Sequence, residues 1–414
     1  MRRQLDLELI GIGKLFVFFI LLFFAGCASP PGGTPPPLVA APVGVPLLRV
    51  RLLANQTRLS ISATQPPAIS TTSNTHARVL DLRAGAKYWL TLSPAGWSLG
   101  GSPLGLGTLT ISPAADGTVA INNHRYRGEY QLVPVSAASF DVINEIDVER
   151  YLRGVILSEM LPHWSYEAYR AQAVAARTYA IYQARTAPPG QAWNLYADTR
   201  SQVYGGMNDE SQIGNQAVDS TRGIVLAYGR RGEERIFCTY FSSCSGGITQ
   251  DCSAVFGYDL PPLRAHIVGN LCAASPHYQW SVALTKESLT ARIRHWGQTN
   301  NRPERDMDRV NRIDVRTVNA LNRPTSFFIT DVHGRRYALA CEDFRHAVNA
   351  GGEVLHSSFI SITNGPDLIR FVGHGAGHGV GLDQWACEEL ARRGYSHEQI
   401  LLWSYPGAVL IRAY

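Results

Sequence analysis

Apolar and polar residues alternate differently in successive parts of the chain. An apolar run from Leu15 to Phe24 follows basic residues near the N-terminus. A membrane-spanning helix needs about 20 apolar residues, so this run is too short to span but suits the core of a signal peptide. Residues 28–46 are rich in Pro and Gly and show no periodicity. We therefore expect a tether there that buries no core.

Residues 47–140 contain short β-rich runs separated by Gly, Pro and Asn. RLSISAT, KYWLTL and YQLVPV are examples of these runs. Short strands broken by turn residues are typical of a small all-β unit. We expect a β-rich N-terminal region over 47–140.

The pattern becomes helical at Glu145. Apolar residues recur at helical spacing from Val148 to Ile156, until Pro162 interrupts the pattern. A second helix is predicted to begin after Ser165, a suitable N-cap, and its alanines form a thin face that another backbone can approach. Strands and short helices mix further on, so the whole chain is predicted to be α+β, with mixed sheets around a helical segment.

Composition and charge exclude some classes of protein. The chain is 45% hydrophobic and 17% charged, as in an ordinary globular protein. A net charge of +5 over 414 residues, without a long basic run, favours an anionic partner such as wall or membrane only weakly. We expect no nucleic-acid partner.

The seven cysteines raise two alternatives, disulfides or a metal site. Cys27 follows the signal-like run, which leaves an even number, and disulfides are the default in an oxidising compartment. Four of these cysteines crowd into one segment: Cys238, Cys244, Cys252 and Cys272. They can instead hold zinc as thiolates, although the close pairs of a zinc ribbon are missing. Cys341 and Cys387 are too far apart in sequence to be paired by inspection.

The residues around Cys27 resemble the lipobox of bacterial lipoproteins. Small residues precede the cysteine, as Phe24-Ala25-Gly26-Cys27. The resemblance implies a signal peptide over 1–26, lipidation of Cys27 and a lipid-anchored tether over 27–46; an ordinary secretory signal or N-terminal anchor is the alternative. We expect a cell-envelope lipoprotein, on the periplasmic face of the outer membrane where the cell has one, because Asp is absent at residue 28.

Three further segments together resemble the SpoIID/LytB family. The first ends in Ser158-Glu159-Met160 and continues into AQAVAARTY at 171–179. The second contains SQVYGG at 201–206 and YFSSCSGG at 240–247, and the third is GHGVGLDQW at 377–385. The resemblance extends from about Leu47 to Tyr414. It departs from the family pattern at Asp383, where Ser is usual, and at Ala386-Cys387, which replaces Gly-Ala.

The resemblance implies that residues 141–414 form the catalytic region of a peptidoglycan lytic transglycosylase. Such an enzyme cleaves glycan strands, preferably those lacking stem peptides, and leaves 1,6-anhydromuramic acid ends. Glu159 is the expected acid and base, and neither cofactor nor metal is expected. The apolar corner from Met160 to Pro162 favours a raised carboxyl pKa, whereas a helix-terminal salt bridge is the structural alternative. A hydrolase would normally need a second carboxylate, and no comparable candidate stands out.

Arg177, Ser242 and Ser243 are candidate substrate-binding residues. Arg177 can grip a carboxylate of the substrate, or it can fasten two helices through a buried ion pair. Ser242 and Ser243 lie in a turn of small residues that can bring hydroxyls and N–H groups close to a sugar, or that simply bends the chain.

His378 and Gln384 complete the set of candidates. His378 lies among glycines and can bind substrate or orient Glu159, although a lone His is often structural. Gln384 and the neighbouring Trp385 suit sugar recognition by an amide hydrogen bond and ring stacking; a core Trp is the alternative.

A second class of function is a non-catalytic enhancer of a cell-wall amidase, because some relatives in the family are described in that way. The presence of Glu159 does not separate the two, since a binding module can retain the residue. A metal-dependent peptidase or amidase is a third hypothesis. The expected partners are glycan strands, a membrane through the lipid and, as a further candidate, a wall amidase. A role in envelope remodelling during growth or division is a hypothesis, and sporulation does not follow from the family name.

Overall fold

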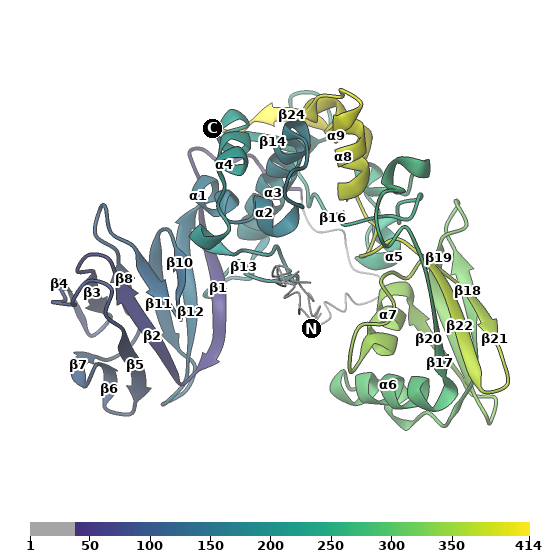
Figure 1. Ribbon diagram of the computed structural model, residues 1–414, viewed down its shortest axis with the longest axis horizontal. Helices are drawn as coiled ribbons and strands as arrows, with labels where there is room; N and C mark the ends of the chain where they lie inside the picture. Colours follow the sequence, from purple (N-terminus) through teal and green to yellow (C-terminus); the bar gives the residue numbers. More distant parts are fainter. Residues whose placement is uncertain (1–37) are drawn as a thin grey trace, which may run out of the picture.

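The computed structural model describes residues 38–414. The signal peptide and Cys27 lie outside the described residues, so both stay predictions. Within residues 38–414, no helix is long and apolar enough to cross a membrane. The α+β class predicted from the sequence is confirmed. Figure 1 shows three lobes arranged as an arch, and each lobe has its own hydrophobic core.

The β lobe consists of two sheets packed face to face. Its strands alternate buried and exposed positions, as in Leu109–Ser112, because successive side chains of a strand point to opposite faces. Trp97 and Phe140 meet edge to face in the core, with ring centroids 4.8 Å apart. The first sheet contains, in spatial order, β13 (Leu195–Tyr196), β1 (Leu47–Gln56), β12 (Phe140–Asp147), β11 (Glu129–Pro134), β8 (Leu109–Ser112), β3 (Ala68–Thr71) and β4 (Asn74–Val79). The second contains β10 (His124–Tyr126), β9 (Val119–Ile121), β2 (Arg58–Ala63), β5 (Tyr88–Ser93), β6 (Gly96–Leu99) and β7 (Ser102–Gly105).

The helical lobe forms the top of the arch in Figure 1. Its elements come from two parts of the chain, one between residues 148 and 272 and the other after residue 381. Its helices are α1 (Val148–Arg153), α2 (Ile156–Glu159), α3 (Tyr166–Thr186), α4 (Gln212–Ser220), α8 (Gln384–Arg392) and α9 (His397–Ser404). A short helix, α5 (Cys252–Val255), lies between this lobe and the third lobe, and its Val255 packs against the cores of both. A three-stranded sheet joins β15 (Arg235–Ile236), β14 (Ile224–Tyr228) and β24 (Val409–Arg412), and β16 (Phe241–Ser242) pairs in parallel with β23 (Leu382–Asp383). Short 3-10 turns complete it: η1 (Gly206–Asn208), η2 (Pro261–Leu263) and η3 (Gly269–Cys272).

A third lobe, the inserted lobe, occupies residues 279–374 and has a separate core. A second core within 141–414 was not predicted from the sequence, which indicated one region there. Its elements are β17 (Gln279–Thr285), α6 (Lys286–Thr299), η4 (Pro303–Asp306), β18 (Val310–Val318), β19 (Pro324–Asp331), β20 (Arg336–Ala340), α7 (Cys341–Asn349), β21 (Ile360–Asn364) and β22 (Leu368–His374). They form two three-stranded sheets, ordered β17-β22-β21 and β18-β19-β20.

Helix α3 is the centre of the helical lobe. It begins after Ser165, as the sequence predicts, and it contacts α4, α8, α9 and β14. Small side chains allow this crowding, because neighbouring backbones can approach an alanine face closely. The alanines of that face are fully buried: Ala168, Ala171, Ala175 and Ala176.

Arg177 of α3 and Glu149 of α1 form a buried ion pair. The guanidinium is 0% exposed, and its Nη2 lies 2.8 Å from Glu149 Oε2. Arg177 also donates to the carbonyls of Val218 and Ile224, so it ties α4 and β14 to α3. Burial raises the pKa of Glu149, but the hydrogen bonds and charge of Arg177, together with hydrogen bonds from Tyr414 and Gly223, lower it overall.

Removing one partner of this pair leaves a buried charge uncompensated. We expect Arg177→Met to lower the free energy of unfolding by about 3–5 kcal/mol, measured by urea denaturation. Arg153→Met is the matched control, because Arg153 pairs with Asp219 at the surface and such pairs contribute about 1 kcal/mol or less. Equal losses in the two variants would contradict a special role for the buried pair.

Candidate functional site

Glu159 is the last residue of α2, where the chain leaves the helix. Met160 adopts an extended conformation directly after it, so the carboxylate stands at a corner rather than along a helix face. The side chain of Glu159 is half-buried. Its Oε1 accepts a hydrogen bond of 2.6 Å from the backbone N–H of Val203, in the loop that precedes η1.

Burial governs the acidity of Glu159. Desolvation raises its pKa to about 7, while the Val203 N–H and the Gln384 side chain act in the opposite direction. Among the described residues, no neighbouring charge is one of the groups that shift this pKa. Glu159 is therefore a carboxyl that can hold or release its proton near neutral pH, without help from a second carboxylate.

The Val203 loop is held by buried polar contacts. Gln202 accepts a hydrogen bond from the Tyr151 hydroxyl and donates to the carbonyl of Ala176 on α3. The hydroxyl of Ser158 donates to Asp209 and accepts from the N–H of Gly205. The sequence singled out the SQVYGG segment, but the role of a backbone N–H cannot be read from side-chain identity.

Gln384 reaches Glu159 from the opposite end of the chain. It is the first residue of α8, and Asp383 caps that helix by accepting from the N–H of Ala386 at 2.9 Å. Asp383 also accepts from the N–H of Ser245 at 2.7 Å, which fixes the start of α8 to the segment after β16. Gln384 is only 5% exposed, and its Nε2 has no partner of good hydrogen-bond geometry among the described residues. An unpartnered buried amide at this position can serve a ligand.

Ser242 and Ser243 hold the loop before α8. The Ser242 hydroxyl accepts from the N–H of Gly379, and the carbonyl of Ser243 accepts from the N–H of Trp385. Ser242 is buried, and its hydrogen bond with Gly379 positions the GHGVG segment. Direct substrate binding by either serine stays a prediction.

His378 is an uncharged group at neutral pH. Burial lowers its pKa to about 4, and Nδ1 accepts from the N–H of Val380. The ring packs edge-on against Tyr240 and Phe256, with centroids 6.0 Å and 5.3 Å away. The negative charge of Glu342, in the inserted lobe, acts in the opposite direction and raises this pKa. No contact between His378 and Glu159 exists in the described part of the chain, and a substrate-binding role for His378 stays a prediction.

Arg177 does not join this group. Its guanidinium is fully buried in the ion pair with Glu149, which is the structural alternative considered for it above. A side chain without solvent exposure cannot grip the carboxylate of a bound substrate. The structure thus brings together Glu159 and Gln384, supports them through the Ser242–Ser243 turn, and assigns Arg177 to the core.

All six cysteines of the described residues are buried free thiols, so the expected disulfides are not formed in this structure. The crowded four also divide between two places. Cys244, Cys272 and Asp383 have ligand atoms within 4.8 Å of one another. Cys252 is not part of that trio; it lies close enough to Cys238 for the two thiols to interact electrostatically. Two thiols and a carboxylate are ligands that suit a divalent cation such as zinc. The expectation of no metal therefore stays a prediction.

Comparisons with known proteins agree with the resemblance in the sequence. Residues 136–228, which include Glu159 and Val203, match the SpoIID family, described as Stage II sporulation protein. An uncharacterized protein of Brachyspira hyodysenteriae is 28% identical over 70% of this chain and 73% of its own length. The Stage II sporulation protein D of Bacillus subtilis is 25% identical over 68% of this chain and 79% of its own length. The Amidase enhancer of Bacillus subtilis is also 25% identical, but the match covers 63% of this chain and only 40% of that protein.

The raised pKa of Glu159 predicts how stability depends on pH. The folded state holds this proton more tightly than the unfolded state, so folding stability is lost as pH rises from about 4.5 to about 7. Glu159→Gln has no carboxyl to ionise at this position, so its folding stability should not fall over this pH range. We expect the variant to be more stable than the natural chain by roughly 1–3 kcal/mol at pH 8, with little gain near pH 4.5.

Thermal and urea unfolding at both pH values measure this difference. Glu398→Gln is the control, because Glu398 is an exposed residue of α9 and its loss should leave stability within about 0.5 kcal/mol at either pH. A gain in Glu159→Gln that does not depend on pH would show that the carboxyl is not ionising as described.

Proposed function

We propose that the chain, whose residues 136–228 match the SpoIID family, is a peptidoglycan lytic transglycosylase. The observation that carries the proposal is that burial raises the pKa of Glu159 to about 7 while no charged group of residues 38–414 shifts it. The protonated carboxyl donates to the glycosidic oxygen of the glycan as the bond breaks. The resulting carboxylate then accepts the proton of the sugar's own 6-hydroxyl, whose oxygen closes the 1,6-anhydro ring. One residue returns to its starting state, and no water is consumed.

The environment of Glu159 supports a single-carboxylate reaction. A retaining hydrolase keeps its second carboxyl about 5 Å away, and at that separation two carboxylates shift one another's pKa strongly. No acidic group among the described residues has this influence on Glu159. The Val203 N–H stabilises the carboxylate formed midway, and burial restores the acid at the end of the reaction.

We infer that the substrate is glycan without stem peptides and that a lipid on Cys27 anchors the protein in the cell envelope. A non-catalytic role as an enhancer of a wall amidase is the second candidate, favoured by the relative that carries this name.

Denuded glycan strands incubated with the full chain test the mechanism. We expect products with 1,6-anhydromuramic acid ends by mass spectrometry, and we expect Glu159→Gln to slow their formation by at least about a hundredfold, because the general acid is lost. Glu398→Gln should cleave at the natural rate. Reducing-end products without the anhydro ring would indicate a hydrolase. Absence of cleavage together with stimulation of an added amidase would favour the enhancer.

The pH dependence of the rate is a second test. The reaction begins with protonated Glu159, so kcat should fall as pH rises through about 7. Gln384 lowers the pKa of Glu159, so Gln384→Ala should move the falling limb of the pH–rate profile to higher pH. A limb that stays in place would show that Gln384 does not contact the reacting carboxyl.

A further inference from the structure

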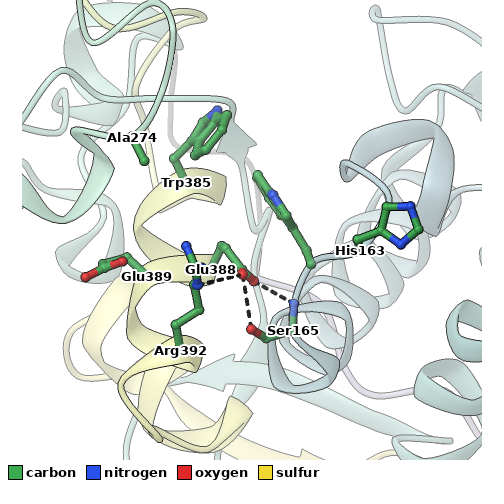
Figure 2. Close-up of a pocket in the computed structure, with 8 residues that line it drawn as sticks. His163, Ser165, Ala274, Trp385, Glu388, Glu389 and Arg392 are labelled. Carbon is green, nitrogen blue, oxygen red and sulfur yellow. Dashed lines mark hydrogen bonds and ion pairs between the residues drawn. The ribbon is translucent and has the colours of Figure 1, made fainter.

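A pocket of about 240 Å³ lies between α8 and the turn before α3, and the mechanism above does not use it. Figure 2 shows the residues around it, which come from the turn before α3, from α8 and from the segment after η3. The lining residues are His163, Trp164, Ser165, Ala274, Trp385, Glu388, Glu389 and Arg392. One wall begins four residues after Glu159 and the other begins at the residue after Gln384. Trp164 contacts Trp385, and Gln384 lowers the pKa of Glu159, so the two walls are the chain segments that continue from Glu159 and from Gln384.

Two tryptophans form the apolar part of the pocket. Trp164 and Trp385 meet edge to face, with ring centroids 5.1 Å apart, and both are half-buried. No group in residues 38–414 accepts a hydrogen bond from either indole N–H. Aromatic faces that flank polar groups are typical of small-molecule sites, and a free indole N–H can bind a hydroxyl or carbonyl of a ligand.

The backbone that presents Trp164 is strained. His163 has a φ of 69°, in the left-handed region that costs free energy for a residue with a side chain. His163 is exposed, so burial of its own side chain does not explain this conformation. Leu161, two residues earlier, is 49% exposed. The strained turn is followed directly by Trp164, which contacts Trp385 in the pocket.

The charges of the pocket are balanced. Glu388 accepts from the N–H and hydroxyl of Ser165 and lies 3.8 Å from Arg392, as the dashed lines of Figure 2 indicate. Glu389 pairs with Arg393 at 2.7 Å. Both carboxylates thus have a cationic neighbour, yet each retains acceptor capacity. A neutral ligand with several hydroxyl or amide donors matches this lining better than an ammonium or a carboxylate.

We propose that the Trp164–Trp385 pocket is a binding subsite for a neutral N-acetylated pyranose of the substrate glycan. The sugar stacks on an indole face, donates from its hydroxyl and acetamido groups to Glu388 and Glu389, and holds the strand so that the neighbouring glycosidic bond lies at Glu159. The inference rests on the proposed function for the identity of the polymer. It goes beyond that function in assigning residues to a sugar that does not react.

Binding of the N-acetylglucosamine tetramer to the full chain, measured by calorimetry, tests the subsite without requiring cleavage. The Glu159→Gln background prevents turnover. We expect Trp164→Ala to weaken binding by about tenfold, as for the loss of one aromatic contact. Trp164→Tyr keeps a stacking face and should bind within about threefold of the parent. Trp89→Ala is the matched control, because Trp89 is 50% exposed in the β lobe under Arg58 and its loss should leave the affinity unchanged.

The Tyr variant also protects the test against misfolding. If Trp164→Ala unfolds, Trp385→Phe and Glu389→Gln take its place, with losses of about threefold or more expected. The deacetylated glucosamine tetramer should bind more weakly than the acetylated one; tighter binding would overturn the neutral-sugar assignment, as would unchanged affinity in Trp164→Ala.

Kinetics with denuded glycan separate this inference from the proposed function. Trp164→Ala in the natural background should raise KM more than it lowers kcat. Cleavage that depends on Glu159 but not on Trp164 or Trp385 would reject the subsite and leave the mechanism standing. Loss of tetramer binding in Trp164→Ala, in a chain that cleaves no glycan, would reject the mechanism and leave the subsite standing.

Discussion

The buried pair of Arg177 and Glu149 is the interaction on which the helical lobe depends. A guanidinium without solvent exposure is acceptable only where its donors and charge are satisfied, and here one carboxylate and several carbonyls satisfy them. Glu149 in turn accepts from the N–H of Gly223 and from the hydroxyl of Tyr414. A single pair thereby joins α1, α3, the turn before β14 and the C-terminus. The position of α2, which carries Glu159, follows from α1 and α3 on either side of it.

The second constraint is the return of the chain to this lobe after residue 374. The parallel contact of β16 with β23 places Asp383 where it can cap α8 and bind Ser245 at the same time. Asp383 stands where Ser is usual in the family pattern, and the second carboxylate oxygen explains how it serves both N–H groups. Gln384 follows directly, so its approach to Glu159 is a consequence of the cap. Glu159 and Gln384 are therefore positioned by two separate polar networks.

Local features of the sequence predicted much of this arrangement. Helix α3, its start after Ser165 and its buried alanine face follow from periodicity and small residues, which act over a few turns. The raised pKa of Glu159 also agrees with the apolar residues that follow it. The inserted lobe was not predicted, because strands such as β18 and β19 are recognisable in sequence while their separation into a second core depends on contacts between distant segments. The role of Val203 was missed for a related reason, since any residue type supplies the same N–H.

Arg177 illustrates the limit of inference from residue type. An arginine near a catalytic glutamate suits both a substrate carboxylate and a buried partner, and only burial separates the two. Trp164 is the opposite case: it lies outside the segments that carried the resemblance, yet the left-handed turn at His163 brings it against Trp385. The corner that follows Glu159 thus continues into the wall of a pocket. The turn buries Met160 in the core of the helical lobe and exposes Leu161, Pro162 and His163, so the half-buried Trp164 keeps ring surface that a ligand can reach.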